Sequence, residues 1–317
     1  MSEIPVVTLF GREVSVYFLL AAAAYLAFAA LMIAAWKKKK ARSAAPAVLF
    51  AVLAAVLGLL LGRLIYCSVR FNRMFYDEMG DWRGLLPFWM PQEGSVNVIG
   101  VLLGCLLAAL CAGKMTGTQA GKLLDSAAPP GLGLFAALRF IEPLSGQGYG
   151  PLVESPLLCW TPLSIDSGWD SWSLSVCFLE GLLLLAVAAA VWKLPCKKDG
   201  TRALYALALM AGTQIIPETF RQDNVLLIFI FASVTQIGYA VLLFSALAVS
   251  LRGMGRKTAA REIPLFLLGV ALLVGAEFAL DKTEWSPLLL YIGMFLILGG
   301  MTAMTVHRIR RHDKSPA

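Results

Sequence analysis

The 317-residue sequence has few charged residues, since only 15% are charged while 59% are apolar, and the mean hydropathy is +0.74. Soluble domains carry about 25% charged residues. This composition excludes an ordinary soluble enzyme, a disordered chain and a fibrous repeat. It predicts one polytopic membrane protein rather than two soluble domains.

Histidine is equally scarce, because His307 and His312 are the only two and both lie near the C-terminus. A Ser-His-Asp or Cys-His mechanism and a histidine metal site are therefore excluded from the rest of the chain. A general base would have to be a carboxylate, a tyrosine or the substrate's own environment. The six cysteines form no CxxC pair, which argues against a disulfide framework or a zinc site. We expect no cofactor. No basic module interleaved with aromatic residues is present, so we also expect no nucleic-acid partner.

Apolar stretches of about 20 residues, long enough to cross a bilayer, recur along the chain. Two are weak, because residues 124–141 contain Asp125 and a Pro-Pro pair and residues 202–218 end in charge. Seven are clear: 16–36, 46–67, 96–113, 173–192, 225–250, 263–280 and 286–306. The predicted fold is an all-α, polytopic transmembrane helix bundle of about nine spans, with residues 69–95 and 142–171 as long loops.

Lysine and arginine are distributed unevenly between the segments that join these stretches. Most of the 27 fall in alternate segments, namely 37–45, 114–122, 193–202, 251–261 and 307–317. Cytoplasmic loops carry such an excess of positive charge. The sequence therefore predicts that the N-terminus is outside and the C-terminus inside. No internal repeat is visible, which argues against a transporter.

Several ionisable residues fall within or beside the predicted spans, where a charge is costly and usually faces a polar interior. The predicted topology places these in the outer half of the membrane: Arg63, Arg139, Glu142, Glu180, Glu218 and Arg221. Gln214, Glu218 and Arg221 share one helix face, and Arg139 and Glu142 share another. We expect one outward-facing polar pocket suited to an anionic lipid headgroup, because guanidinium binds phosphate bidentately. The alternative is a set of buried ion pairs that only fix the helix register.

A series of short motifs runs from about residue 58 to residue 250. Gly62-Arg63-Leu-Ile-Tyr66 is similar to G-[AG]-R-x-G-Y, with one residue fewer between the glycine and the arginine. Ile99-Gly100-Val-Leu-Leu-Gly104 is similar to H-G-G-x-x-G, and Asp125-Ser-Ala-Ala-Pro129 is similar to D-x-x-A-P. All three patterns belong to one family of membrane enzymes, and the motifs that follow belong to it as well.

The later motifs keep the family's order and spacing. Arg139, Gly146, Tyr149 and Gly150 fit the signature G-R-x-G-N-F-x-x-G-x-x-[WY]-G. Glu180 fits the glutamate of H-P-x-Q-L-Y-E, while Glu218, Phe220 and Arg221 fit R-x-x-x-E-F-x-R, and Gln236 matches a glutamine in the next span. In this order and spacing, the sequence resembles the prolipoprotein diacylglyceryl transferase family.

The resemblance implies a function in lipoprotein maturation. The family transfers diacylglyceryl from phosphatidylglycerol to the thiol of a lipobox cysteine in a preprolipoprotein, so phosphatidylglycerol, or another anionic phospholipid, and a preprolipoprotein peptide are the expected partners in a bacterial plasma membrane. It implies that Arg139, Glu142 and Glu218 are catalytic. It also implies a substrate-binding set of Arg63, Tyr66, Gly100, Gly104, Gly146, Tyr149, Gly150, Glu180, Gln214 and Arg221. Residues 1–261 would form a transferase-like core of seven spans, and residues 262–317 an additional two-helix hairpin with a basic cytoplasmic tail.

Departures from the family pattern leave three functions open. Ile99 replaces the motif histidine, Glu142 replaces the asparagine of the signature, and Gln214 replaces the first arginine of R-x-x-x-E-F-x-R. Leu174 and Leu179 replace the histidine and tyrosine before Glu180. The chain could be an active transferase, an inactive homologue that binds phospholipid or lipoprotein precursors, or an unrelated small-molecule permease.

Overall fold

The structure, a computed structural model, describes most of the chain. The described residues are 5–9, 12–38, 43–76, 79–85, 88, 96–168, 171–222, 227–229, 232–252, 254, 256–282 and 286–314. Parts of the two expected loops, 69–95 and 142–171, and of three basic segments, 37–45, 251–261 and 307–317, lie outside these residues.

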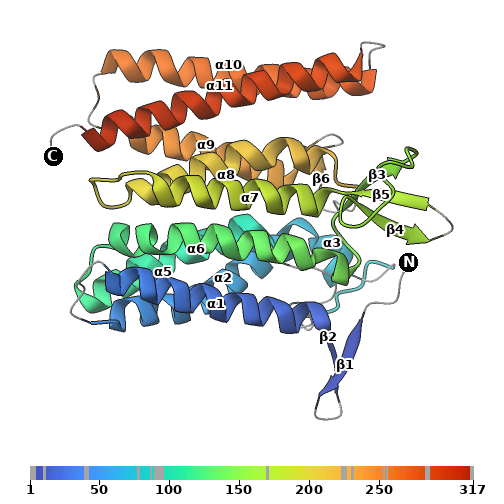
Figure 1. The fold of residues 1–317 in the computed structure, drawn as a ribbon, viewed down its shortest axis with the longest axis horizontal. Coiled ribbons are helices and arrows are strands. Elements are labelled where there is room, and N and C mark those ends of the chain that lie inside the picture. Colours follow the sequence, from blue (N-terminus) through green and yellow to red (C-terminus); the bar gives the residue numbers. More distant parts are fainter. Residues whose placement is uncertain are drawn as a thin grey trace.

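Long helices dominate the described residues and lie side by side with roughly aligned axes (Figure 1). Their bounds are α1 Val16–Lys38, α2 Ala45–Val69, α5 Val98–Thr116, α6 Ala120–Ile141, α7 Val176–Lys193, α8 Thr201–Thr219, α9 Val234–Ser250, α10 Arg256–Lys282 and α11 Pro287–Lys314. Two short helical segments are α3, Phe71–Phe75, and the 3-10 helix η1, Glu142–Ser145. The predicted all-α bundle is confirmed, and each predicted span overlaps one long helix.

Short antiparallel strands lie between some of the helices. β1 (Val6–Leu9) pairs with β2 (Arg12–Ser15), which leads directly into α1. β3 (Tyr149–Val153), β4 (Ser164–Gly168) and β5 (Ser171–Ser175) form a sheet in the order β3-β5-β4. The prediction that residues 142–171 form only a loop is therefore wrong, and the helix expected from residue 173 begins at Val176 because β5 precedes it.

The span expected over residues 225–250 is also shorter than predicted. β6 (Leu227–Phe229) pairs with β7 (Ala232–Ser233), and α9 begins only at Val234. A capping box marks this start, because Ser233 Oγ accepts a hydrogen bond from the Gln236 amide at 3.0 Å and Gln236 Oε1 accepts one from the Ser233 amide at 2.9 Å. Hydropathy alone cannot separate the apolar hairpin from the apolar helix that follows it.

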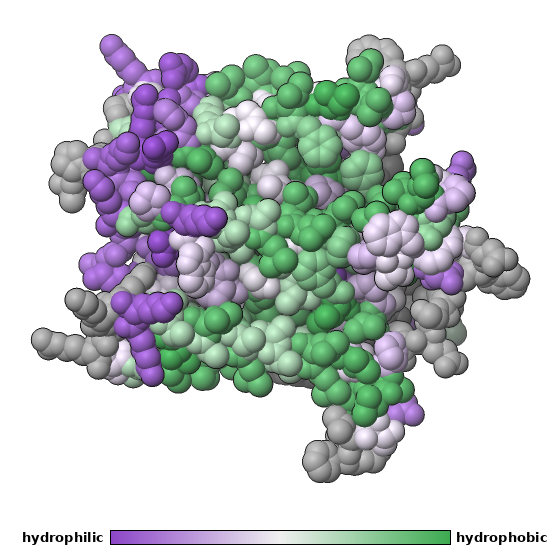
Figure 2. All heavy atoms as spheres, viewed as in Figure 1, coloured by the Kyte–Doolittle hydropathy of each residue, from purple (hydrophilic) through white to green (hydrophobic). Residues whose placement is uncertain are grey.

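Apolar surface shows that this is a multi-pass membrane protein. Six of the long helices are long and apolar enough to cross a membrane, namely α1, α2, α5, α7, α10 and α11, and α9 is a shorter apolar helix. Figure 2 shows hydrophobic residues over the middle of the bundle and hydrophilic residues gathered at its left end, where α1 ends in Lys37 and Lys38. The count of nine spans and the N-out, C-in orientation remain predictions.

α2 and α5 pack closely through two pairs of glycines. A Cβ atom on Gly104 would lie 2.5 Å from the Gly58 Cα atom, and one on Gly100 would lie 2.4 Å from the Leu61 carbonyl oxygen. Gly58 and Gly62 on α2 have the same i, i+4 spacing as Gly100 and Gly104 on α5. Small residues at this spacing let helix backbones approach each other in membranes.

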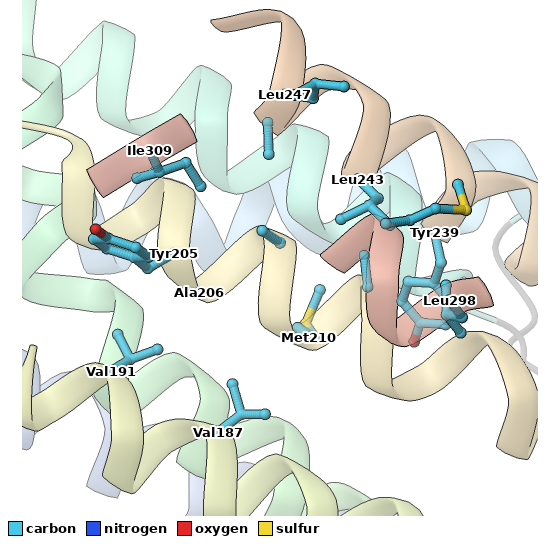
Figure 3. Packing of buried hydrophobic residues seen from close by; sticks show 14 of the residues in the cluster. Val187, Val191, Tyr205, Ala206, Met210, Tyr239, Leu243, Leu247, Leu298 and Ile309 are labelled. Atoms are coloured by element: carbon cyan, nitrogen blue, oxygen red, sulfur yellow. The ribbon is translucent and has the colours of Figure 1, made fainter. Parts of the chain in front are cut away.

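The hydrophobic core is divided into two large clusters that both include residues of α6. Phe28, Phe50, Ala108 and Leu123 represent the cluster of α1, α2, α5 and the first half of α6. The other cluster joins the second half of α6 to α7, α8, α9, α10 and α11. Figure 3 shows side chains of this second cluster, such as Met210 of α8, among neighbouring helices. α6 therefore links the two clusters, and its C-terminal half packs in the second one.

α10 and α11 form a hairpin that packs along α8 and α9 (Figure 1). Within the hairpin, buried Glu262 pairs with buried Arg308. At one end Asp313 accepts hydrogen bonds from the Lys197 and Lys198 amides at 2.8–3.1 Å. At the other end the Tyr291 ring lies 4.9 Å from the Phe220 ring. The division of the chain at residue 261 remains a prediction, although the hairpin contacts both ends of α8.

Candidate active site

The C-terminal end of α6 brings Arg139 and Glu142 together. Arg139 lies in the last turn of α6, and Glu142 begins η1, which continues from it. The i, i+3 spacing places both side chains on one side. Arg139 Nη1 donates to the two Glu142 carboxylate oxygens at 2.8 and 3.1 Å. The shared face expected from the sequence is therefore present.

The end of α8 adds Glu218 and Arg221 to the same group. Arg221 donates to Glu142 from Nη2 at 2.6 Å and from Nη1 at 3.3 Å. Arg139 Nη2 lies 3.8 Å from Glu218 Oε2. The two helix faces recognised in the sequence thus meet, as predicted, although they are about 80 residues apart in the chain.

Glu180 of α7 completes the group. Its Oε2 atom lies 3.1 Å from Arg139 Nε and 3.2 Å from Arg221 Nη1. Gln214 of α8 is fully buried, and its Nε2 donates to the Glu180 carbonyl oxygen at 3.5 Å. Gln214 therefore lies beside the backbone of Glu180, one helix turn before Glu218.

Two guanidinium groups and three carboxylates make up this group, which we call the Arg/Glu cluster: Arg139, Glu142, Glu180, Glu218 and Arg221. The side-chain exposure is 18% for Arg139 and 11% for Glu142, but 7% or less for the other three. Burying a charge requires ion pairs and hydrogen bonds, and the cluster supplies both. Arg139 and Glu142 form its accessible edge.

The glycine-rich turn after η1 lies against the cluster. Gly146 and Gly148 have φ angles of +74° and +91°, which favour glycine. A Cβ atom on Gly148 would lie 3.5 Å from Glu142 Cγ. The following strand is tied to α8, because the Tyr149 carbonyl oxygen accepts a hydrogen bond from the Gln222 amide at 3.1 Å, and a Cβ atom on Gly150 would lie 2.8 Å from the Phe220 carbonyl oxygen. The predicted residues Tyr149 and Gly150 therefore lie beside the two chain neighbours of Arg221, and the predicted Gly146 follows the turn that begins with Glu142.

All of these residues lie in the part of the chain that one protein family covers. The family described as prolipoprotein diacylglyceryl transferase matches residues 5–252. The chain belongs to this family. A search of curated proteins finds no match. The prolipoprotein diacylglyceryl transferase family contains membrane transferases of lipoprotein biosynthesis, which act on lipoprotein and phospholipid substrates.

Two residues that fit a transferase-family motif lie in a different group of side chains. Arg63 Nε donates to the Phe88 carbonyl oxygen at 3.1 Å, and its guanidinium carbon lies 5.5 Å from the centre of the Tyr66 ring. The Tyr66 hydroxyl accepts a hydrogen bond from Arg70 Nη1 at 3.0 Å. Tyr66 packs with Cys67 and Phe75. A contact of Arg63 and Tyr66 with substrate remains a prediction.

Gly100 and Gly104, which fit the next transferase-family motif, lie at the close contact between α2 and α5. Their lack of a side chain is required there by the α2 backbone. A substrate-binding role for them also remains a prediction, since helix packing already explains both glycines.

Three residues make contacts that were not predicted from the sequence. Asp125, from the D-x-x-A-P motif, accepts hydrogen bonds from the Gly200 amide at 2.8 Å and the Ala203 amide at 2.9 Å, so this α6 side chain caps the start of α8. Tyr239, buried in α9, and Tyr17 of α1 lie near enough to Arg139 to interact with its charge. A tyrosine in an apolar stretch carries no distinguishing pattern, so nothing in the sequence pointed to either ring.

Among the described residues, no group of three or more histidine, cysteine or carboxylate side chains could hold a metal ion.

Proposed function

We propose that this protein transfers diacylglyceryl from phosphatidylglycerol to the cysteine thiol of a preprolipoprotein at the Arg/Glu cluster. The observation that carries the proposal is the pair Arg139 and Arg221, whose Nη atoms converge on one carboxylate in a chain of the transferase family. Two converging guanidinium groups can bind the two free oxygens of a phosphodiester in the same way. Arg139 is the more exposed of the two, so lipid would meet it first.

The reaction needs a base for the thiol and a cation for the leaving group. The thiol proton passes to a carboxylate, for which Glu142 and Glu218 are the candidates, and the thiolate sulfur attacks the glyceryl carbon that carries the phosphate. A carbon–sulfur bond forms and the carbon–oxygen bond to the phosphate breaks. Glycerol phosphate leaves with both electrons of that bond, and Arg139 and Arg221 stabilise its added negative charge.

The location of the cluster suits an amphiphilic substrate. It lies at the ends of α6 and α8 beside the β3–β5 sheet, at the end of the bundle opposite the lysine-bearing end of α1 (Figure 1). Under the positive-inside rule this is the outer end in a bacterial plasma membrane. Acyl chains could then remain among apolar helices while the headgroup reaches the arginines. Residues 1–261 would form the transferase core, and residues 262–317, which hold most of the α10–α11 hairpin, would support α8 from outside that core.

A second function, lipid or lipoprotein binding without turnover, is favoured by one specific feature. Gln214 stands where the family pattern has an arginine, and it lies buried beside Glu180 rather than adding a third cation. Such a homologue would bind the same lipid without breaking the carbon–oxygen bond.

A transfer assay separates these two functions. Purified protein would be incubated with phosphatidylglycerol labelled in the diacylglyceryl group and with a lipobox peptide, and the peptide mass would be measured. We expect the peptide to gain one diacylglyceryl group and a matched peptide with serine in place of the lipobox cysteine to gain none. Bound labelled lipid without any peptide product would instead establish the binding function.

A further inference from the structure

Glu142 occupies the place between the two arginines where an anionic ligand would bind. Each of its oxygens accepts from both arginines: Oε1 from Arg221 Nη2 at 2.6 Å and Arg139 Nη1 at 3.1 Å, Oε2 from Arg139 Nη1 at 2.8 Å and Arg221 Nη1 at 3.3 Å. Both Nη atoms of Arg221 and the Nη1 atom of Arg139 therefore bind this one carboxylate. A lipid phosphate would require these same donors, because its two free oxygens resemble a carboxylate in charge and spacing.

The charge balance of the Arg/Glu cluster increases this competition. With every group ionised, three carboxylates and two guanidinium groups carry a formal charge of −1. Both arginines contact these carboxylates: Arg139 directs Nε at Glu180, Nη1 at Glu142 and Nη2 at Glu218. Adding a phosphodiester would place a further negative charge in a site that already has an excess, and this repulsion is strong where little water screens it.

Glu142 is also the carboxylate best placed to be exchanged. Its side chain is 11% exposed, against 5% for Glu218 and 0% for Glu180. It belongs to the single turn η1, whereas Arg139 and Glu218 belong to long helices. At Gly146, the residue that ends η1, a Cβ atom would meet nothing within 4 Å. Glu142 therefore lies on the accessible side of the cluster, and open space adjoins its turn at Gly146.

We propose that Glu142 is a specificity-determining residue, a built-in anion that competes with the phosphate of phosphatidylglycerol for Arg139 and Arg221. The inference rests on the proposed function, because it assumes that these arginines bind a lipid phosphate. Phosphatidylglycerol then binds only when the Glu142 carboxylate gives up its place, so the wild-type protein binds this lipid more weakly than a variant without that charge.

Lipid titration of the purified full-length protein tests the inference. Phosphatidylglycerol would be titrated into detergent-solubilised wild type, Glu142→Gln and the control Glu154→Gln, which removes an exposed carboxylate outside the cluster. We expect Glu142→Gln to bind phosphatidylglycerol at least about tenfold more tightly, which is about 1.4 kcal/mol, and Glu154→Gln to bind like wild type. Diacylglycerol, which lacks phosphate, should show no gain. A second neutral variant, Glu142→Asn, should behave like Glu142→Gln.

Two results would overturn the inference. One is equal phosphatidylglycerol affinity in wild type and both neutral Glu142 variants, and the other is an equal gain for diacylglycerol, which would mean only a looser pocket. Failure of the proposed transfer function is separately visible, because the lipobox peptide would then stay unmodified in all variants while the phosphatidylglycerol affinities still differ as expected.

Discussion

Replacement of Asp125 should destabilise the protein and leave its chemistry intact. The buried Asp125 carboxylate accepts two backbone hydrogen bonds, from the Gly200 and Ala203 amides, at the first turn of α8. Removing a capping carboxylate costs about 0.5–2 kcal/mol, and a hydrogen bond to a charged group contributes about 1.5–3 kcal/mol. Because water can hydrate part of the exposed turn afterwards, we expect Asp125→Ala to lower the free energy of unfolding by about 2–3 kcal/mol. Asp125→Asn keeps one acceptor oxygen, so it should lose about half as much.

The same substitution should spare the Arg/Glu cluster, because Glu218 lies at the opposite end of α8, about 25 Å away for a helix of this length. Unfolding by sodium dodecyl sulfate in mixed micelles, followed by circular dichroism, would give the order wild type, Asp125→Asn, Asp125→Ala. Phosphatidylglycerol binding would be measured on the folded fraction. An Asp125→Ala protein as stable as wild type, or one that is folded but has lost lipid binding, would refute the capping role.

Three further predictions concern the bundle. Gly104→Ala should weaken α2–α5 packing and lower the unfolding midpoint, because the new methyl group meets α2 backbone at 2.5 Å, whereas Gly299→Ala, with open space around it, should be neutral or slightly stabilising. Glu262→Gln should cost about 3–5 kcal/mol in the same unfolding assay, since Arg308 would keep a buried charge without its carboxylate; an unchanged midpoint would show that water already reaches the pair. Reporter fusions should place residue 40 in the cytoplasm and residue 160 outside, and a cytoplasmic signal at 160 would end the N-out prediction.

The sequence predicted the helices well because a bilayer makes hydropathy a direct signal of helix position. It also predicted that Arg139 and Glu218 would meet, since an unpaired charge in a span is costly. The predicted start of the helix that contains α9 was wrong, because an apolar hairpin and an apolar helix have the same hydropathy. Only the Ser233–Gln236 capping box marks where the helix begins.

Other features could not be predicted because they depend on packing between distant segments. The capping of α8 by Asp125 joins residues that are 75 and 78 positions apart, so no local pattern encodes it. The contacts of both arginines with Glu142 require the ends of α6 and α8 to meet, since Arg221 lies 79 residues from Glu142 in the chain. In the sequence, Glu142 was only a departure from a motif. In the structure its carboxylate accepts four hydrogen bonds from Arg139 and Arg221.

The most direct measurement is phosphatidylglycerol binding by Arg139→Lys. Lysine keeps the positive charge but supplies one ammonium group in place of a planar fork, so it cannot contact Glu180 and Glu218 and also bind a phosphate with fixed geometry. Native mass spectrometry would compare the phosphatidylglycerol retained by wild type, Arg139→Lys and the exposed control Arg83→Lys, with circular dichroism to verify folding. We expect retention to fall at least about tenfold in Arg139→Lys alone. Equal retention in all three proteins would contradict the assignment of Arg139 as the phosphate-binding residue.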